Sequence, residues 1–422
     1  MGVRTVAIVV ALLALPSSAA AAAHDVQVAD GAVYRAGLTG RYFHPLGSFG
    51  KLNRAVTAGD RRRARLLSQS LIARGRRQGR FGLVWYYNVP GGRSGWTSGL
   101  AQAVAAQALA RAGRTEAARR AFLAIPERLL IRLPQGPWIK LYSYSNVVVL
   151  NAQLQAALSI GHYARLTHDD RARLLARQLR KTAKALLPRF DNGSWSRYSL
   201  NGRSATLEYH EYVTALLWKL SARQRGGRWR IYANRFSKYR RLPPVLRRGD
   251  RAPEVLPVAD GYRDYAPITF WLSKPSTVTF RIAGTRTSQW FERGWQTFQW
   301  WPYEVPAGRY PVWATATDRG GNSTLLGLPW VRVGADESPP AVRVALRGTE
   351  LEWRASDAKS PWFEVRLERM VSGKLRKRNL GRFDRRGAFR LRTPPLQMGT
   401  TTLVIADTSG NVARIPLCAS PS

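Results

Sequence analysis

The sequence predicts a multidomain α plus β protein, in which an N-terminal helical domain is followed by two β-sandwiches. The spacing of the apolar residues is helical from about residue 50 to 225, and its period changes to two after residue 260. The segment 239–260 between these parts is rich in Arg and Pro, which favours a linker. At about 100–200 residues per domain, a chain of 422 residues has room for this arrangement.

The N-terminus has the pattern of a secretory signal peptide over residues 1–23. Arg4 precedes an apolar run, Thr5–Leu15, and a run of small residues follows it. We expect cleavage near Ala19–Ala23 and a secreted or cell-surface protein. The apolar run is shorter than the ~20 residues that span a bilayer, so no transmembrane segment is predicted. Cys418 is the single cysteine, which excludes an intrachain disulfide.

Helical hairpins account for the predicted domain 24–238. Ser98, Ser145 and Asp169 are each placed to cap a helix at its N-terminus. Gly113 and Pro188 mark helix ends. The apolar spacing then predicts helices over 98–109, 115–130, 145–158, 169–188 and 209–220.

Two Ig- or fibronectin-like β-sandwiches are predicted over 261–334 and 340–418. Residues 268–282 have the pattern of two strands joined around Pro275. The turn sequence Asp318-Arg-Gly-Gly-Asn322 recurs 89 positions later as Asp407-Thr-Ser-Gly-Asn411. A turn that recurs between strand-like runs is typical of tandem sandwich modules.

The charge is strongly positive, with 67 Lys and Arg against 26 Asp and Glu and a formal net charge of +41. Such a field attracts polyanions, among them nucleic acid, anionic lipid and acidic polysaccharide. The chain shows no helix-turn-helix, RNA-binding or zinc motif, so no specific nucleic-acid partner is predicted. The five histidines form no metal-binding motif, and no metal or other cofactor is predicted.

Aromatic residues are concentrated near turns between residues 80 and 212. An Asn inside an apolar helical run, such as Asn151, needs a hydrogen-bonding reason to be there, because Asn is a mediocre helix former. Four motifs occur in order: Trp96-x-Ser98-x-x-Ala101-Gln102, Val149-Leu-Asn151, Asp191-x-Gly193-x-Trp195-x-x-Tyr198-x-Leu200 and Tyr209-His210.

Together these motifs resemble the C-terminal domain of the D-glucuronyl C5-epimerases, which act on heparosan-type polysaccharides. The resemblance covers roughly residues 80–225 and implies an α/α-barrel-like (toroid) array of helical hairpins. It also implies a reaction: a proton leaves C5 of a glucuronate unit and another returns to the opposite face. Tyrosines carry those protons in the family, no cofactor is needed, and the partner is an acidic, uronate-containing polysaccharide.

The resemblance assigns the catalytic residues one at a time. Tyr198 matches the tyrosine of the Tyr-x-Leu motif and Tyr209 that of the Tyr-His motif. Either Tyr142 or Tyr144 stands where a third catalytic tyrosine lies. A phenol has a pKa of about 10, so we expect nearby cations to keep one tyrosine partly ionised.

The residues expected to bind substrate come from the same motifs. Asn151 matches a substrate-contacting Asn, and chemistry rather than motif suggests Arg197 and Arg203 for neutralising the uronate carboxylate. The motifs also supply four further candidates: His210, Trp195, Gln102 and Trp96. Animal members of the family have β-rich regions before the helical domain, whereas here barely 60 residues separate the predicted signal peptide from Trp85. We therefore expect the substrate groove to lack a wall unless the β modules supply one.

Two other functions fit the same residues. A uronate lyase begins with the same proton abstraction and then eliminates across C4. A non-catalytic protein could instead hold an acidic glycan with its aromatic and Arg-rich surfaces, to which the aromatic run Trp290–Tyr303 of the β region would add.

Overall fold

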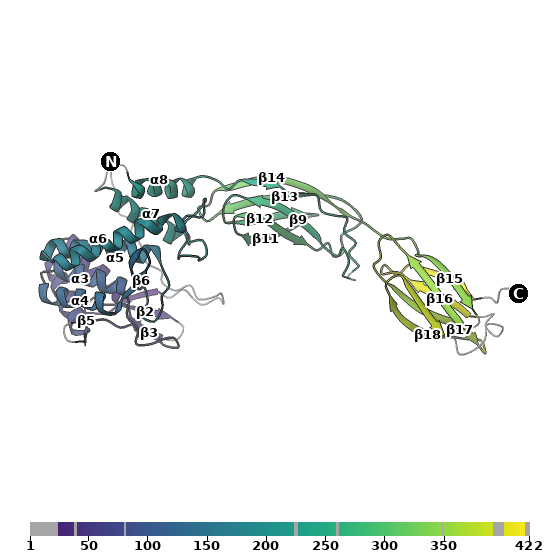
Figure 1. Cartoon of the computed structure of the whole chain (residues 1–422), viewed down its shortest axis with the longest axis horizontal. Helices are drawn as coiled ribbons and strands as arrows, with labels where there is room; N and C mark the ends of the chain where they lie inside the picture. The colour runs from purple at the N-terminus through teal and green to yellow at the C-terminus, as the bar shows by residue number, and fades with distance from the viewer. Residues whose placement is uncertain are drawn as a thin grey trace. The chain divides into compact units, whose positions relative to one another are not determined.

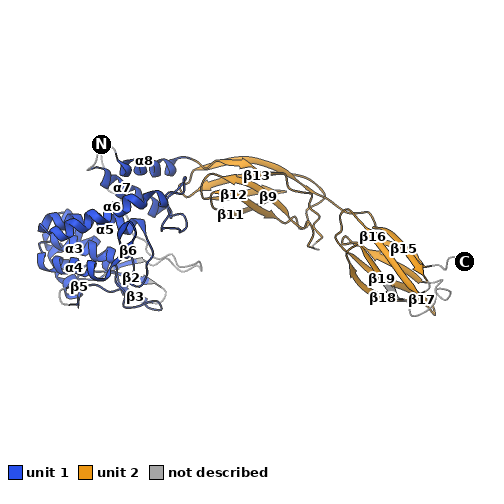
Figure 2. Cartoon of the chain, in the orientation of Figure 1, with its two compact units in different colours: residues 1–242 blue, residues 243–422 orange. Residues whose placement is uncertain are grey.

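The computed structural model describes residues 24–37, 40–79, 82–222, 227–258, 261–347, 349–390 and 401–417. The chain divides into two compact units, residues 1–242 and 243–422 (Figure 2). The predicted signal peptide and Cys418 lie outside the described residues. Among the helices that the structure describes, none is both long and apolar enough to cross a bilayer.

The first unit opens with a small antiparallel sheet that the sequence did not predict. Its strands are β1 (His24–Gln27), β2 (Val33–Gly37) and β3 (Gly40–Phe43), in the order β1-β2-β3. Ser48, in the first helix, ties the sheet to the helices, because its hydroxyl accepts the Val33 amide proton at 2.9 Å. The sheet is therefore part of the helical unit.

The rest of the first unit is a succession of helical hairpins, as predicted (Figure 1). Helices that follow each other along the chain pack as pairs, and two short two-stranded sheets, β4-β5 and β6-β7, lie between pairs. The helices are α1 (Pro45–Thr57), α2 (Arg61–Ala73), α3 (Gly99–Arg111), α4 (Thr115–Arg128), α5 (Leu150–Thr167), α6 (Asp170–Leu186), α7 (Leu207–Ser221) and α8 (Arg228–Arg241), with a 3-10 turn η1 (Leu187–Phe190). The short strands are β4 (Arg76–Gln78), β5 (Gly82–Val84), β6 (Leu130–Leu133) and β7 (Gly136–Ile139).

Two of the three predicted caps are confirmed and one is wrong. Ser98 accepts the Ala101 amide proton at the start of α3, and Asp169 accepts that of Ala172 at the start of α6. Ser145 does not cap α5, which begins at Leu150. Val149, directly before the helix, is extended and forms a β-bridge with Ser199, and this long-range pairing outweighs the local cap.

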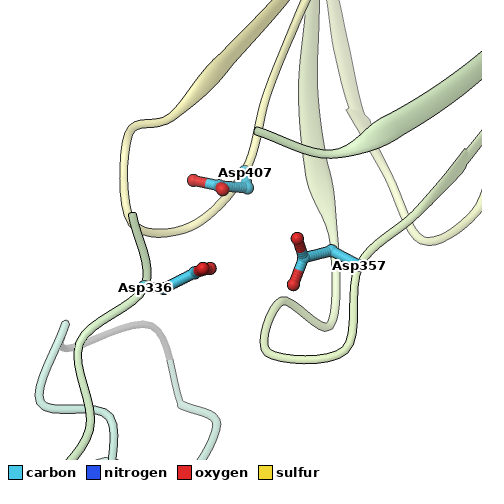
Figure 3. Close-up of side chains that lie close together, drawn as sticks. All are labelled: Asp336, Asp357 and Asp407. Atoms are coloured by element: carbon cyan, nitrogen blue, oxygen red, sulfur yellow. The ribbon is translucent and has the colours of Figure 1, made fainter. Parts of the chain in front are cut away.

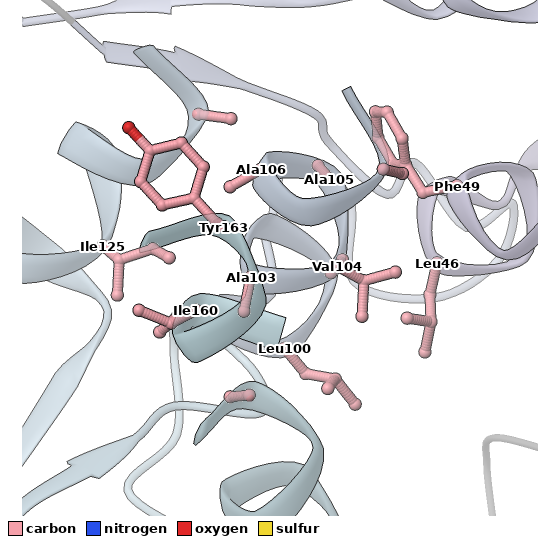
Figure 4. Close-up of a cluster of buried hydrophobic side chains, with 14 of the residues drawn as sticks. Leu46, Phe49, Leu100, Ala103, Val104, Ala105, Ala106, Ile125, Ile160 and Tyr163 are labelled. Atoms are coloured by element: carbon pink, nitrogen blue, oxygen red, sulfur yellow. The ribbon is translucent and has the colours of Figure 1, made fainter. Parts of the chain in front are cut away.

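Helix α3 lies at the centre of the larger hydrophobic core of the first unit and packs against α1, α4 and α5. Its Ala103, Ala105 and Ala106 are fully buried, and such small side chains let neighbouring helices approach closely (Figure 4). Phe49 of α1 and Ile160 of α5 fill the space on either side. A helix buried on several faces needs no polar stripe, which explains its mostly apolar sequence.

The second unit contains two β-sandwiches. The first sandwich has the sheets β11-β10-β13-β14 and β12-β9-β8. Its strands are β8 (Leu246–Arg248), β9 (Ala266–Leu272), β10 (Ser276–Ile282), β11 (Thr285–Phe291), β12 (Gly294–Trp300), β13 (Gly308–Asp318) and β14 (Ser323–Val333). The second sandwich has the sheets β15-β16-β19 and β18-β17-β20-β21. Its strands are β15 (Ala341–Arg347), β16 (Glu350–Ser356), β17 (Phe363–Val371), β18 (Lys374–Phe383), β19 (Arg386–Arg390), β20 (Thr401–Ala406) and β21 (Val412–Pro416).

The segment 239–260 is more structured than the predicted linker. Helix α8 continues to Arg241, β8 pairs with β9, and Val255 forms a bridge with Val333. Its Arg and Pro content does mark the boundary between the units at residue 242. Part of the segment nevertheless belongs to the first sandwich, because Leu246 and Val255 are buried in its core.

The repeated turn has the same geometry in both sandwiches. The Asp318 carboxylate accepts the Asn322 amide proton at 2.9 Å, and the Asp407 carboxylate accepts that of Asn411 at 2.8 Å. The tandem arrangement predicted from this repeat is thus confirmed by the two sets of sheets.

Candidate functional site

Three of the predicted catalytic tyrosines lie together in the first unit. Tyr142 precedes α5, Tyr198 lies in an extended segment and Tyr209 in the first turn of α7. The hydroxyl of Tyr198 is within hydrogen-bonding distance of those of Tyr142 and Tyr209. The rings of Tyr198 and Tyr209 meet edge to face, with centroids 4.8 Å apart. We call these three residues the tyrosine site.

Backbone pairing brings the segments of the tyrosine site together. The Leu200 amide donates to the Val148 carbonyl at 2.9 Å, beside the bridge between Val149 and Ser199. Residues that are distant along the chain therefore hold Tyr198 beside the loop that carries Tyr142.

The structure chooses between the two upstream tyrosines. Tyr142 is half-buried and reaches Tyr198, whereas the side chain of Tyr144 is 43% exposed. The Tyr144 ring stacks on that of Tyr142 at 5.5 Å, and the Arg93 guanidinium lies 4.5 Å from its centroid. Tyr142 therefore belongs to the tyrosine site, and Tyr144 lies at its rim.

A narrow pocket adjoins Tyr142, and Trp96 forms part of its wall. Trp96 stacks on Tyr87 with centroids 4.1 Å apart and meets Tyr142 edge to face at 5.2 Å. The pocket is lined by Tyr42, His44, Tyr87, Trp96, Ser98, Leu141 and Tyr142. Tyr42 comes from the N-terminal sheet and His44 follows that sheet directly, so the short N-terminal segment supplies a wall that we expected to be missing.

His44 presents a hydrogen-bond donor in this pocket. Its Nδ1 accepts the Gly47 amide proton at 3.1 Å, so the neutral ring carries its proton on Nε2. That Nε2 is buried and has no hydrogen-bond partner among the described residues. Burial, with Arg35 adding to its effect, lowers the pKa of His44 to about 3, so the ring is neutral at ordinary pH.

The acidities of the tyrosines differ from our expectation. Burial raises the pKa of Tyr142 to about 12 and also raises the pKa of Tyr198 and of Tyr209. The expectation that cations keep one tyrosine ionised is therefore wrong for the free protein, since burial outweighs them. Tyr209 has the most support for its ionised form, because a hydrogen bond from Tyr198 and the charge of Arg35 both act to lower its pKa.

Arg35, rather than Arg197 or Arg203, is the cation that acts on the tyrosine site. It lies on β2, is 3% exposed, and its Nε donates to Asp25 at 3.0 Å. Arg197 donates to the Gly202 carbonyl at 3.0 Å, and Arg203 is exposed. No motif could have indicated Arg35, because it is far from the tyrosines in sequence.

Asn151 is buried in the first turn of α5, next to the backbone of Tyr198. The Leu150 amide donates to the Tyr198 carbonyl at 3.4 Å. The Oδ1 of Asn151 has no hydrogen-bond partner among the residues that the structure describes. An unpartnered buried acceptor is costly, which keeps Asn151 a candidate for contact with substrate.

Three of the predicted substrate-binding residues make buried contacts within the protein. Gln102 is buried, accepts the Trp85 amide proton and donates to the carbonyls of Leu83 and Ala121. Gln153 makes the equivalent bonds one hairpin later: it accepts the Ile139 amide proton and donates to the carbonyls of Pro137 and Leu179. Each glutamine ties a short strand to the helices of its hairpin.

His210 does the same in the third such hairpin, with both ring nitrogens used. It accepts from the Ser196 amide through Nδ1, and Nε2 lies 2.9 Å from the Phe236 carbonyl. Trp195 stacks on it at 3.8 Å and donates to the Ala205 carbonyl. Gln102, His210 and Trp195 thus have contacts within the protein that hold the hairpins together, and their role in substrate binding stays a prediction.

The described residues also hold a group of carboxylates that the sequence did not predict, in the second sandwich. Asp336, Asp357 and Asp407 each offer an oxygen, and these atoms lie within 4.8 Å of one another (Figure 3). Burial raises the pKa of Asp336, and the other two carboxylates raise it further. Oxygen donors of this kind suit Ca²⁺ or Mg²⁺. In the first sandwich the turn residue Asp318 is instead paired with Lys274, at 2.6 Å.

Comparison with known proteins agrees with the motifs. Residues 75–238 match the family described as D-glucuronyl C5-epimerase C-terminus. The predicted resemblance is therefore confirmed for this segment, which contains the tyrosine site. No curated protein matches the chain.

The similarities to solved structures are distant. An endoglucanase from Komagataeibacter sucrofermentans is 11% identical, with 43% of this chain and 68% of that chain covered and a TM-score of 0.34. The family 8 endoglucanase Cel10 from Klebsiella pneumoniae is 14% identical, with 46% and 74% covered and a TM-score of 0.35. The fibronectin(III)-like modules of Clostridium thermocellum CbhA are 13% identical, with 42% and 94% covered and a TM-score of 0.18.

Proposed function

We propose that the first unit inverts C5 of glucuronate units in an acidic polysaccharide, and that the protein is exported to do so. The observation that carries the proposal is the hydrogen-bonded group of Tyr142, Tyr198 and Tyr209 within a segment that matches the epimerase family. The α/α toroid that the resemblance implies is part of this proposal, and the consecutive helical hairpins support it.

The three phenols can move the two protons that the reaction needs. Tyr209, as phenolate, takes the C5 proton, and the electron pair left behind is delocalised onto the uronate carboxylate. The Tyr142 hydroxyl then gives its proton to C5 from the opposite face and becomes the phenolate. Tyr198 lies between them, so it can accept a proton from Tyr209 while donating its own to Tyr142, which restores the starting state. Protons are conserved over the cycle.

The neighbouring side chains fit the charges that develop. Arg35 acts on Tyr209 and favours its ionised form. The neutral His44 can donate from Nε2 to a substrate oxygen, and the buried Oδ1 of Asn151 can accept from a sugar hydroxyl. Because burial raises the pKa of all three tyrosines, turnover should increase with pH from 7 to 10.

Proton exchange at C5 tests the proposal directly. The full chain is incubated with heparosan in D₂O, and NMR follows deuterium at C5 and the appearance of iduronate. We expect exchange that Tyr198→Phe and Tyr209→Phe abolish, while the affinity for heparosan changes less than about two-fold. Accumulation of an unsaturated uronate would instead identify a lyase. No exchange on any uronate polymer would refute the enzymatic proposal.

A non-catalytic glycan-binding function is the second candidate. It is favoured by one observation, the raised pKa of the tyrosines, since a binding site has no need of a phenolate. In that case heparosan binds without exchange, and Tyr198→Phe leaves the affinity unchanged.

A further inference from the structure

A basic hollow in the first unit plays no part in the function proposed above. Helices α6 and α7 both pack against α5, and between them lies about 1020 Å³ of empty space that includes its opening to solvent. We call it the basic groove. The groove is lined by two leucines, by Trp229 and by the basic residues Arg177, Arg180, Lys181, Lys184 and Lys219.

Four of the cations that line the basic groove are not neutralised by carboxylates of the described residues. Arg177, Lys181 and Lys184 are spaced four and three residues apart, so they share one face of α6, and Lys219 faces them from α7. Within the described part of the chain, none of these four makes an ion pair. No carboxylate is among the described residues that line the groove.

Some basic residues on other helices of the same unit have acidic partners. Arg119 pairs with Glu116 on α4, and Arg240 of α8 pairs with Glu211 of α7. Like charges three or four residues apart destabilise a helix. The basic residues that share one face of α6 therefore lower the stability of the free protein. An anionic ligand would remove that repulsion.

We propose that the basic groove binds an anionic polysaccharide. It holds one part of the same polysaccharide molecule whose uronate unit occupies the tyrosine site. This inference rests on the proposed function. Helix α7 connects the two places, since Tyr209 lies in its first turn and Lys219 near its end. Ten residues at 1.5 Å each put them about 15 Å apart along the helix. A polymer with a carboxylate on every second sugar can reach both, whereas a disaccharide cannot.

A variant that removes three cations tests the groove. Arg177→Gln, Lys181→Gln and Lys184→Gln are combined in the full chain, because Gln favours helices and keeps the stem of the side chain. The matched control combines Arg61→Gln, Arg62→Gln and Arg65→Gln on the exposed face of α2, which lowers the net charge equally. Calorimetry gives the affinity for long heparosan at several salt concentrations, and deuterium exchange at C5 is measured on a heparosan disaccharide.

We expect the groove variant to lose at least ten-fold in affinity for long heparosan and the control less than two-fold. The slope of log K against log salt should fall by about two for the groove variant, at ~0.7 per lost contact with a single-stranded polyanion. Exchange on the disaccharide should be the same in all three proteins.

Four results would overturn the inference. The first is an equal loss of affinity for long heparosan in both variants, and the second is an unchanged affinity in the groove variant. The third is no binding of long heparosan by the wild type. The fourth is single-stranded DNA that binds the wild type as tightly as heparosan does and loses affinity for the groove variant to the same extent. The disaccharide reports on the proposed function separately. If deuterium exchanges into the disaccharide but the groove binds no heparosan, only the proposed role of the groove is refuted. If the groove binds heparosan but no deuterium exchanges at C5, only the proposed enzymatic function is refuted.

Discussion

His44 links the stability of the first unit to pH. It caps α1 and is buried, and burial together with Arg35 lowers its pKa from 6.5 to about 3, while Asp25 opposes the shift. Between these two values the unfolded chain binds a proton that the folded protein does not, so stability is complete above pH 6.5 and falls as the pH falls. Each pH unit costs about 1.4 kcal/mol. From pH 7.5 to 5.0 the free energy of unfolding should therefore fall by about 2 kcal/mol through His44 alone.

His44→Asn should remove this dependence. Asn is among the best N-cap residues, so it can accept the Gly47 amide proton in place of Nδ1, and it does not titrate. His44→Ala should also lose the pH dependence, but it loses the cap and should be ~1 kcal/mol less stable than His44→Asn at both pH values. Urea unfolding at pH 7.5 and 5.0 measures these differences. Circular dichroism at 222 nm follows the first unit, because the described helices lie within residues 45–241.

The control is His168→Asn. His168 ends α5 with a φ of 57°, a left-handed conformation that Asn tolerates. This variant should keep the wild-type difference between pH 7.5 and 5.0. If His44→Asn keeps that difference as well, His44 is not held neutral by burial, and the assignment of its Nε2 as a donor in the pocket is refuted.

Three further outcomes are expected. Tyr144→Phe should retain C5 deuterium exchange while Tyr198→Phe abolishes it, because only Tyr198 bridges the other two phenols; equal rates measured by NMR would contradict the tyrosine relay. Lys274→Met leaves the carboxylate of Asp318 buried without its partner and should lower the free energy of unfolding of the second unit by ~3–5 kcal/mol in calorimetry, with part of it recovered by adding Asp318→Asn. Asp357→Asn relieves the repulsion among three neighbouring carboxylates and should raise the melting temperature of the second unit in EDTA, and a lower value would show that the carboxylates do not repel.

Local patterns in the sequence determined the central helices of the first unit and the two sandwiches that follow. The apolar period gave the helical hairpins, and the serine and aspartate caps at residues 98 and 169 are where the structure has them. The repeated Asp-x-x-Gly-Asn turn indicated two sandwiches, since the carboxylate binds amides only a few residues away. These features depend on contacts within a few residues along the chain, so the sequence is enough to read them.

The tertiary structure decided which residues come into contact and how their pKa values are shifted. Nothing local distinguishes Tyr142 from Tyr144; the pairing of the segment around Val149 with that around Ser199 does. Gln102 and His210 matched family motifs, yet their buried hydrogen bonds show that they hold the hairpins together. Arg35 comes to Tyr209 only through the fold. The motifs named the tyrosines, but burial sets their pKa, and burial is a property of the packed unit rather than of any segment of the sequence.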